Sequence, residues 1–540
     1  MRILLVFLLL IAGCAANPNL TPAESSGLTF IHLNDTYRVG AVEDGKRGGF
    51  GRVVTVTREL QAKGRDVRIL HGGDFLYPSL ESQLWNGLQM VDAFNYMDAL
   101  APMYVVIGNH ELDRRTPEHL ANAVRASNFD WLGDNYRFVT GDSEVDAALQ
   151  SAFTVEYAGK TIGFFALLLH ADDGGNDRDY APVDKDYVGN AKRVIKILEA
   201  QGIDAIIGVT HLHLYQDREI AALRKEHPKL AFIVGGHEHE PQFSPMSDAS
   251  AAVMKGASNA RVIWRIDLSF DADGLPQIDG QMLDMDSSVV PDPDYALLDN
   301  KWRARLLEKF PFLEARVGGA AFPLDATEET IRNNENAWGN FIVDQMLMAF
   351  GDPAADFAFI NSGTLRIDDF IADDIAFEDI GRTFGFSSFL RHLTMTGAEF
   401  RQLMEAGFRG TGESKGYFPQ IAGFRVCVDR SRDSGSRIVS MQVPGDAGWR
   451  DIDAQREYMV VIPDFLFRGG DGYQVPKKRK EQASRAGSEL KYLVLDGIIR
   501  AQAEGRAIGK PVDPANPRIV VLGAQRNSCW QNGDIPDLTR

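Results

Sequence analysis

The sequence predicts an α/β protein with more than one domain. Five apolar runs, typical of short buried strands, occupy residues 28–33, 67–70, 103–107, 203–209 and 230–234. The segments between these runs include helix-like stretches, for example residues 51–63 and 191–201. Strands that alternate with helices indicate a sandwich of α and β layers. Because 540 residues are too many for one hydrophobic core, we expect two large domains.

The composition is that of a globular, acidic protein. Hydrophobic residues make up 44% and charged residues 24% of the chain, which are ordinary values for a folded domain. The formal net charge of −18 argues against nucleic acid or an anionic membrane surface as the main partner. One basic run, residues 477–480, follows a proline and predicts a solvated loop.

The N-terminus predicts export. An apolar run at residues 3–11 is too short to span a bilayer and ends in Ile11-Ala12-Gly13-Cys14, which resembles a bacterial lipobox. In this interpretation residues 1–13 are a lipoprotein signal peptide, Cys14 carries the lipid, and residues 14–26 form a tether. The alternative is an ordinary secretory signal with an incidental cysteine. Both interpretations predict an exported mature protein.

Two further observations concern the compartment. Ala15 follows Cys14, so there is no aspartate to favour inner-membrane retention, and we expect the periplasmic face of the outer membrane. Cys427 and Cys529 could pair in an oxidising compartment. The sequence leaves open whether these two cysteines lie close enough to do so.

Each of the five apolar runs ends in a polar cluster. In α/β sheets the ligand crevice lies beyond the carboxyl ends of the strands, so these clusters can converge. A single aspartate or histidine there is more often a cap or turn former, but the ordered set predicts a metal site. Carboxylate, amide and imidazole donors suit zinc, manganese or cobalt, and paired ions of this kind hydrolyse phosphate esters. The clusters contain, in order, Asp35, Asp74, Asn109, His110, His211, His237 and His239.

The order of these clusters resembles the signature of the calcineurin-like metallophosphoesterases. The matching motifs are Asp35, Gly73-Asp74, Gly108-Asn109-His110-Glu111, Thr210-His211 and Gly236-His237-Glu238-His239. With the second half of the chain, the spacing is similar to the 5′-nucleotidase family, which includes bacterial UDP-sugar hydrolases and 2′,3′-cyclic phosphodiesterases. The resemblance implies a four-layer α/β/β/α metallophosphoesterase sandwich followed by a second mixed α/β substrate-binding domain.

The resemblance also implies a role for each candidate residue. Two divalent ions would share the carboxylate of Asp74, and Asp35 with His239 would complete the first site. His110 would not bind metal but would stabilise the transition state or protonate the leaving group, oriented by Asp113. Glu111 would serve local structure. The second metal site would be completed by Asn109, His211 and His237.

The first metal site departs from the family pattern. The family usually has Asp-x-His where this chain has Asp35-Thr36-Tyr37. Three interpretations compete: Tyr37 lies outside the ligand set, it binds iron as a phenolate, or the site is weakened. We favour the first, because every other ligand position is filled. The identity of the first metal depends on this residue.

The second half carries glycine turns, aromatic residues and arginines instead of a metal cluster. Two glycine turns with exposed aromatics could form a slot for a flat ring, although each aromatic alone is explained by core packing. The resemblance implies that Phe418 and Phe465 sandwich a nucleobase and that Asp471 holds the ribose hydroxyls. The groups implied to bind the phosphate chain and neighbouring atoms are Arg332, Asn361 and Arg366.

Two departures affect this phosphate site. The family's Asn-Gly-Gly-Gly-x-Arg is altered to Asn361-Ser362-Gly363-Thr364-Leu365-Arg366, and Asn334 stands where a second arginine is common. We expect these changes to alter the phosphate geometry but not the class of ligand.

These expectations combine into one prediction of function. The chain would be an exported 5′-nucleotidase-type hydrolase in which a hydroxide held by two metals attacks phosphorus in line. Alternatives are a 2′,3′-cyclic nucleotide phosphodiesterase, a UDP-sugar hydrolase, a thiosulfate-pathway hydrolase, or a non-catalytic nucleotide-binding lipoprotein. The expected domains are residues 27–290 (catalytic), 291–320 (linker helix), 321–525 (substrate binding) and 526–540 (tail).

Overall fold

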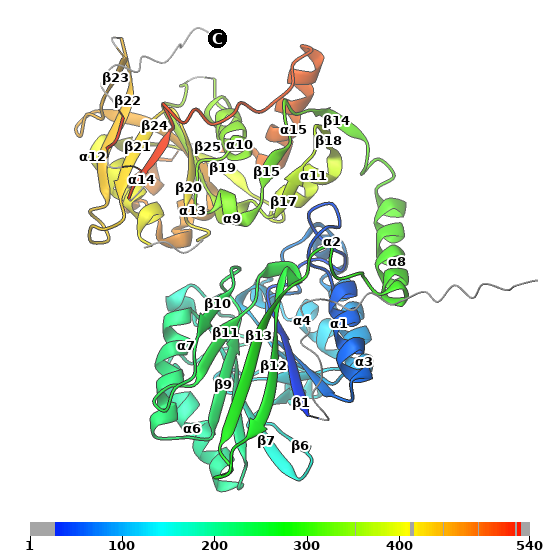
Figure 1. Ribbon diagram of the computed structural model, residues 1–540. Helices are drawn as coiled ribbons and strands as arrows, with labels where there is room; N and C mark the ends of the chain where they lie inside the picture. Colours follow the sequence, from blue (N-terminus) through cyan, green and yellow to red (C-terminus); the bar gives the residue numbers. More distant parts are fainter. Residues whose placement is uncertain are drawn as a thin grey trace, which may run out of the picture.

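The protein consists of two α/β domains joined by one helix (Figure 1). The computed structural model describes residues 27–523 except 352, 411–414, 447 and 484, together with residues 526 and 528–530. The predicted signal peptide, Cys14 and tether lie outside the described residues, as does most of the predicted tail. Within the described ranges, no helix combines the length and apolar character that crossing a membrane would require.

Two β-sheets form the centre of the first domain. The seven-stranded sheet has the order β13-β12-β1-β2-β3-β4-β5, and the six-stranded sheet has the order β10-β11-β9-β8-β7-β6. The strands of the first sheet are β1 (Leu28–Leu33), β2 (Asp66–His71), β3 (Met103–Val106), β4 (Asp130–Leu132), β5 (Leu149–Gln150), β12 (Val262–Phe270) and β13 (Pro276–Asp284). Those of the second are β6 (Thr154–Tyr157), β7 (Lys160–Leu168), β8 (Ala205–His211), β9 (Leu230–Gly235), β10 (Gln242–Ser244) and β11 (Ala252–Lys255).

The two sheets pack face to face, with helices on their outer faces. Phe30 on β1 contacts Phe164 on β7 and Phe232 on β9, at ring-centroid distances of 6.2 and 5.7 Å. Helices α1 and α3 lie on one side of the sheets and α6 and α7 on the other (Figure 1). The predicted four-layer α/β/β/α sandwich is therefore confirmed. The helices are α1 (Phe50–Ala62), α3 (Leu88–Leu100), α4 (Glu118–Ala126), α6 (Tyr187–Ala200) and α7 (Leu214–Ala221).

The central strands are parallel, which places their carboxyl ends at one edge of each sheet. β1, β2, β3 and β4 pair in parallel in the first sheet, and β7, β8 and β9 do so in the second. Strands buried on both faces are expected to be apolar, and residues 205–209 of the fully buried β8 carry no polar side chain. The polar clusters at the strand ends can therefore meet.

The second domain is built on two larger sheets with two core regions. It also contains two two-stranded sheets, β14 (Arg316–Gly319) with β18 (Asp374–Ala376) and β15 (Leu324–Ala326) with β17 (Asp369–Ile371). A five-stranded sheet has the order β20-β16-β24-β19-β25, and a four-stranded sheet has the order β23-β22-β21-β26. These strands are β16 (Phe357–Asn361), β19 (Phe389–Thr396), β20 (Pro419–Ala422), β21 (Arg425–Asp429), β22 (Ile438–Gly445), β23 (Gly448–Asp451), β24 (Glu457–Pro463), β25 (Arg485–Glu489) and β26 (Ile519–Leu522). Helices α10 (Ala337–Leu347) and α15 (Leu490–Ala503) enclose one core, in which Trp338 is fully buried.

A disulfide joins Cys427 on β21 to Cys529, which the sequence left open. It ties the segment around residue 529 to the four-stranded sheet.

The predicted loop at residues 477–480 is wrong, because these residues begin helix α14 (Lys477–Gln482). Arg479 in this helix is buried and paired with Glu399 and Glu457 at 2.9 and 2.8 Å, so two carboxylates anchor the basic run.

Helix α8 (Pro293–Lys309) connects the domains and packs on the first one. The side chain of Asp292 accepts hydrogen bonds from the backbone N–H groups of Asp294 and Tyr295, and a proline follows at the first helical position. Trp302 packs against Trp85 at a ring-centroid distance of 5.1 Å. The helix is therefore fixed to the first domain before the chain enters the second.

Buried polar contacts join the domains beside the strand ends. Asp368 of the second domain is 5% exposed, and its carboxylate accepts from Ser258 Oγ at 3.0 Å and from Asn259 Nδ2 at 3.1 Å. The guanidinium of Arg261 in the first domain also pairs with Asp368. Glu328 donates its backbone N–H to the same carboxylate at 3.0 Å.

We predict that Asp368→Ala separates the two domains. Removing one partner of a buried ion pair typically costs about 3–5 kcal/mol, and here the cost falls on the domain contact because Arg261 and Asp368 lie in different domains. Small-angle X-ray scattering should show a larger radius of gyration. Asp373→Ala, which removes an exposed acid nearby, is the matched control. Equal scattering from both variants would contradict the prediction.

Candidate functional site

Glycines allow the strand ends of the two sheets to approach closely. A Cβ on Gly73, which has φ +85°, would lie 2.5 Å from the backbone nitrogen of Gly108. A Cβ on Gly72 would lie 2.8 Å from the nitrogen of Gly236. The loops after β2, β3 and β9 are thus in direct contact. This contact explains the glycines of the sequence motifs, because a side chain at these positions would not fit.

Three candidate ligands have backbone conformations that side-chain-bearing residues rarely adopt. The φ angles of Asp35, Asp74 and His237 are 52°, 62° and 77°, in the left-handed region. Asp35 accepts a hydrogen bond from the N–H of His237 at 2.9 Å, and its own N–H donates to the carbonyl of Gly73 at 2.9 Å. Such strain persists only where the surroundings enforce it and is often found at functional sites.

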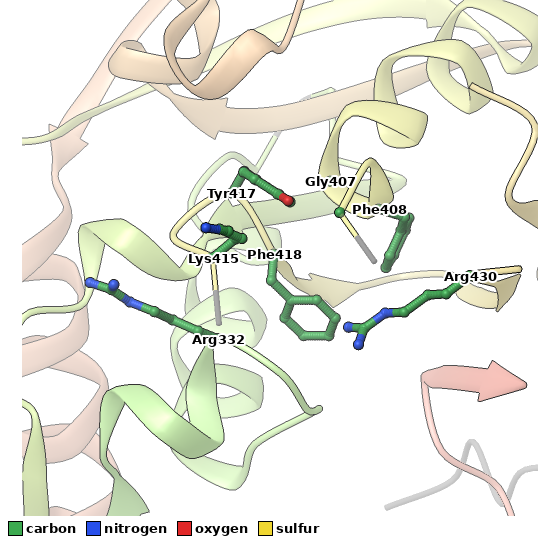
Figure 2. A pocket seen from close by; sticks show the side chains of 8 residues that line it. Arg332, Gly407, Phe408, Lys415, Tyr417, Phe418 and Arg430 are labelled. Carbon is green, nitrogen blue, oxygen red and sulfur yellow. The ribbon is translucent and has the colours of Figure 1, made fainter. Parts of the chain in front are cut away.

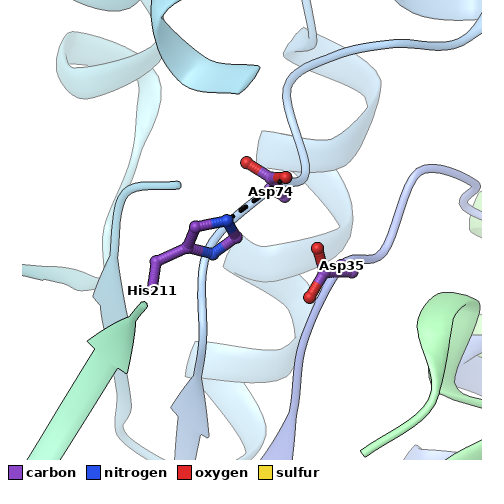
Figure 3. A group of neighbouring side chains, drawn as sticks. All are labelled: Asp35, Asp74 and His211. Carbon is purple, nitrogen blue, oxygen red and sulfur yellow. Dashed lines mark ion pairs between the residues drawn. The ribbon is translucent and has the colours of Figure 1, made fainter. Parts of the chain in front are cut away.

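Asp35, Asp74 and His211 form a buried group of metal-binding character (Figure 3). One donor atom from each of the three lies within 4.8 Å of the other two. Asp74 Oδ2 is 3.4 Å from His211 Nε2. These residues end β1, β2 and β8, so the parallel strands bring them together as the sequence predicts.

Asn109 and two histidines form a second group of donors. Asn109 Oδ1 lies 3.1 Å from His211 Nε2 and 3.2 Å from His237 Nδ1. His211 Nδ1 lies 2.6 Å from the carbonyl oxygen of Gly72. Because a carbonyl only accepts, Nδ1 carries the hydrogen and Nε2 faces the donor group. Backbone contacts of this kind fix the tautomer of metal-binding histidines.

His239 is oriented from the other domain. Its Nε2 lies 3.3 Å from Asp35 Oδ1, and its Nδ1 is hydrogen-bonded to the carboxylate of Glu328. Glu328 begins helix α9 (Glu328–Ile331) of the second domain and is buried. Burial opposes protonation of His239, but Glu328 and Asp35 outweigh it and raise the pKa of His239 to about 9.

The charges in this cluster fit bound cations. Burial opposes ionisation of Asp74, but His211 and His110 outweigh it and hold the pKa of Asp74 well below its usual range. Burial likewise opposes protonation of His211, yet Asp74 raises the pKa of His211 to about 9. Buried carboxylates without a counter-charge are costly. Metal ions bound here would replace the histidine protons as the counter-charge, so the residues present fit a metal centre.

His110 and Asp113 form a dyad beside the cluster. His110 Nδ1 lies 3.0 Å from Asp113 Oδ2, and His110 Nε2 lies 3.9 Å from Asp74 Oδ2. Burial lowers the pKa of His110, but Asp113 and Asp74 outweigh it, so the pKa stands above the ordinary value. Asn176 donates to the other oxygen of Asp113 at 2.6 Å and holds that carboxylate in place.

The phenol of Tyr37 lies close to three predicted metal ligands, and whether it belongs to the ligand set stays a prediction. Its phenol oxygen lies 3.4 Å from Asp35 Oδ1, 3.3 Å from Asp74 Oδ2 and 3.2 Å from His239 Nε2. The intervening Thr36 turns away and contacts His71 Nε2 at 2.9 Å. Burial, followed by the charges of Asp74 and Asp35, raises the pKa of Tyr37 well above its ordinary value.

Two arginines of the second domain reach the edge of this cluster. Arg366 Nη2 lies 3.5 Å from His110 Nε2, and its guanidinium lies 5.0 Å from the centre of the Tyr37 ring. Arg366 Nη1 is 3.6 Å from Glu328 Oε1, which also pairs with Arg332. The structure therefore brings the predicted phosphate-binding arginines next to the candidate metal ligands.

The other predicted substrate residues lie within the second domain. Asn361 Nδ2 donates to Asp471 Oδ2 at 2.7 Å, so these two lie together. Phe418 is 2% exposed and packs edge to face against Phe408, whereas Phe465 is 41% exposed. Among the described residues there is no ring contact between Phe418 and Phe465. The predicted base sandwich remains a prediction.

A small cavity lies beside Phe418 (Figure 2). Its volume is about 10 Å³, enough for a single water molecule. Arg332, Lys415 and Arg430 supply its positive charges, and Tyr417 lies on its rim. Arg332, which pairs with Glu328, therefore lines the same cavity as Phe418.

Known protein families match both halves of the chain. The calcineurin-like phosphoesterase profile matches residues 28–241, and that of the 5′-nucleotidase C-terminal domain matches residues 316–478. The chain belongs to the 5′-nucleotidase family. The predicted family and the predicted class of enzyme, a phosphoric ester hydrolase, are thereby confirmed, and a calcineurin-like phosphoesterase domain implies divalent metal ions.

Individual relatives of this 5′-nucleotidase family member are distant in sequence. The snake venom 5′-nucleotidase of Crotalus adamanteus is 24% identical over 90% of this chain and 89% of its own. The trifunctional nucleotide phosphoesterase protein YfkN of Bacillus subtilis is also 24% identical, over 83% of this chain, but the match spans only 32% of that protein. The solved 5′-nucleotidase precursor of Thermus thermophilus has the same fold, with a TM-score of 0.77, 22% identity and coverage of 92% of this chain and 99% of its own.

Three supporting residues of this family member were not found from the sequence. Glu328 and Asn176 lie in segments without a motif and reach the site only through tertiary contacts. Lys255 is fully buried and pairs with Asp217 at 2.8 Å and with Glu238 at 2.5 Å. The sequence contains one signal of Lys255: Glu238, between the candidate ligands His237 and His239, would need a positive partner if it were buried.

We predict that Glu328→Gln weakens binding of the metal ion that His239 holds. Replacing a carboxylate that orients a metal-binding histidine typically costs about 10–100-fold in metal affinity. Competition with a chromogenic chelator would measure the affinity of the metal-free protein for manganese or zinc. The exposed neighbour variant Glu329→Gln is the control. Equal affinities in the two variants would show that Glu328 does not orient a ligand.

Proposed function

We propose that this protein is a metal-dependent phosphohydrolase that releases phosphate from nucleotides. The observation that carries the proposal is the position of Arg366, 3.5 Å from His110 and across the domain boundary from the donor cluster. A guanidinium fork facing carboxylate, amide and imidazole donors is suited to a phosphoryl group. The proposed metal ligands are Asp35, Asp74, Asn109, His211, His237 and His239.

Divalent ions, of which zinc, manganese and cobalt suit these donors, would supply Lewis acidity to water and to the phosphoryl oxygens. The chain itself orients the reacting groups. Arg366 and Arg332 would hold the non-reacting phosphate oxygens, and Glu328 between them keeps both guanidinium groups in place. Charge that develops on the phosphoryl oxygens would be stabilised by these fixed cations.

His110 is suited to donate a hydrogen bond or a proton. Asp113 accepts from its Nδ1, so its Nε2 faces the cluster. Because the pKa of His110 is raised, the imidazole stays protonated to higher pH than an ordinary histidine. A cation at this position can stabilise the transferred group or protonate the departing oxygen.

The nucleoside part of the substrate would bind to the second domain. Asp471 is placed by its bond with Asn361 and offers a carboxylate to ribose hydroxyls. The exposed Phe465 offers a flat apolar face for a base. Phe418 would become its partner only if the aromatic region around it opened, because Phe418 is buried by Phe408.

We further propose that the protein is exported and lipid-anchored through Cys14. The apolar run at residues 3–11 and the lipobox-like sequence support this. The disulfide between Cys427 and Cys529 is consistent with an oxidising compartment. A snake venom relative is also compatible with export. We also propose that the domain boundaries fall at residues 290 and 320, because helix α8 lies between these positions.

We predict that Asn109→Ala and His110→Ala each lower phosphate release at least about 100-fold while the fold survives. Asn109→Ala removes a proposed metal ligand, and His110→Ala removes a cationic donor beside the reacting group. The assay is a panel of AMP, ADP, UDP-glucose and 2′,3′-cyclic AMP, with and without added manganese, cobalt and zinc. Asn122→Ala, an exposed amide on α4, is the control.

The same panel separates the alternative functions. Preference for the cyclic nucleotide or for UDP-glucose would replace the 5′-nucleotidase assignment by that activity. No release from any compound by metal-loaded wild-type protein would favour a nucleotide-binding lipoprotein. Undiminished release by purified Asn109→Ala would remove the proposed site.

We predict that Asp113→Asn shifts the alkaline limb of the kcat profile to lower pH. Asp113 raises the pKa of His110, so its neutralisation lets the imidazole lose its proton at lower pH. Steady-state phosphate release across the pH range would measure the shift. Asp179→Asn, which removes an exposed charge from a neighbouring loop, should leave the limb in place. An unshifted limb in Asp113→Asn would exclude His110 as the group that titrates.

A further inference from the structure

Tyr37 contributes a phenol oxygen to a cluster of predicted metal ligands. The atoms around this oxygen are Asp35 Oδ1, Asp74 Oδ2 and His239 Nε2, at 3.4, 3.3 and 3.2 Å. They belong to the ends of three different strands, which meet around this one oxygen. Tyr37 thus lies among the donors of the first site rather than beside them.

The separations match those between ligands of one ion. Two ligand atoms that each lie about 2.1 Å from an ion are about 3.0 Å apart at a right angle and about 3.4 Å apart at the tetrahedral angle. The three separations at Tyr37 fall within this range. Two carboxylate oxygens close to a phenol oxygen that has one hydrogen to share also favour a cation between them.

The surroundings hold the ring in this position. Tyr37 is 7% exposed, and its backbone N–H donates to Asn259 Oδ1 at 3.0 Å. Its ring lies edge-on to His110 at 6.3 Å, and Arg366 covers it at 5.0 Å. Residues of both domains therefore fix the phenol, and rotation away from the cluster would disturb His110 and Arg366.

We propose that Tyr37 is a ligand of the ion at the first site, together with Asp35, Asp74 and His239, and that this site selects iron(III). The proposal rests on the proposed function and refines it, because it assigns iron(III) to the first site and leaves a divalent ion at the second. Three anionic oxygens and one imidazole form a donor set that suits a hard ion better than zinc. The bond from iron(III) to the phenolate oxygen replaces the O–H bond, the proton passes to solvent, and no electron is transferred.

Spectroscopy of the iron(III)-loaded full chain tests this proposal. A phenolate bound to iron(III) gives a visible charge-transfer band and resonance Raman bands of the coordinated ring. The metal-free protein is titrated with iron(III), and the band should appear in the wild type and be at least tenfold weaker in Tyr37→Phe. Tyr77→Phe is the matched control, because Tyr77 follows Asp74 by three residues but its hydroxyl bonds Asn86 Oδ1 at 2.7 Å.

Three outcomes would overturn the proposal: no band in iron-loaded wild type, a band that survives in Tyr37→Phe, or one ion per chain in the wild type and two in Tyr37→His. The last would show that the phenol takes the place of an ion. Circular dichroism confirms that the variants fold. Phosphate release with manganese or zinc is measured separately, so activity without the band removes only this proposal, and the band without activity removes only the proposed function.

Discussion

The site depends on the carboxylate of Glu111, which joins two loops. This fully buried group accepts hydrogen bonds from the backbone N–H groups of Asp74, Phe75 and Leu76 at 2.9, 2.7 and 2.8 Å, and from that of Gly108 at 2.6 Å. Burial and the charge of Asp74 raise the pKa of Glu111 to about 7, against the effect of these amides. Without Glu111 the amides would lie buried and unpaired, which is costly. These hydrogen bonds hold Asp74 in its left-handed conformation. They also fix Gly108, and with it the position of the next residue, Asn109.

The site is shared between the two domains. The first domain supplies the candidate metal ligands, and the second supplies Arg332, Arg366 and Glu328. The chain as a whole is strongly acidic, with a formal net charge of −18. An anionic substrate would nevertheless meet two guanidinium groups at the cluster, because the local charges near a buried site outweigh a distant average.

Much of this could be predicted from the sequence, for a definite reason. The apolar runs give the parallel strands, and parallel strands place whatever follows them at one edge, so Asp35, Asp74 and His211 are brought together as expected. The position of the Tyr37 phenol could not be predicted, because its direction depends on Thr36 contacting His71. Glu328 could not be found, since it meets His239 only across the contact between the two domains. Neither contact leaves a periodic or spaced pattern in the chain.

The bond between His239 and Glu328 has a thermodynamic consequence. One partner belongs to each domain, so separating the domains would release the imidazole that faces the first site. Ion binding and interdomain contact then become linked equilibria, and this linkage is reciprocal. If contact between the domains raises ion affinity by some factor, ion binding raises the equilibrium constant for that contact by the same factor. Metal supply would then set the fraction of molecules in which the two domains are in contact.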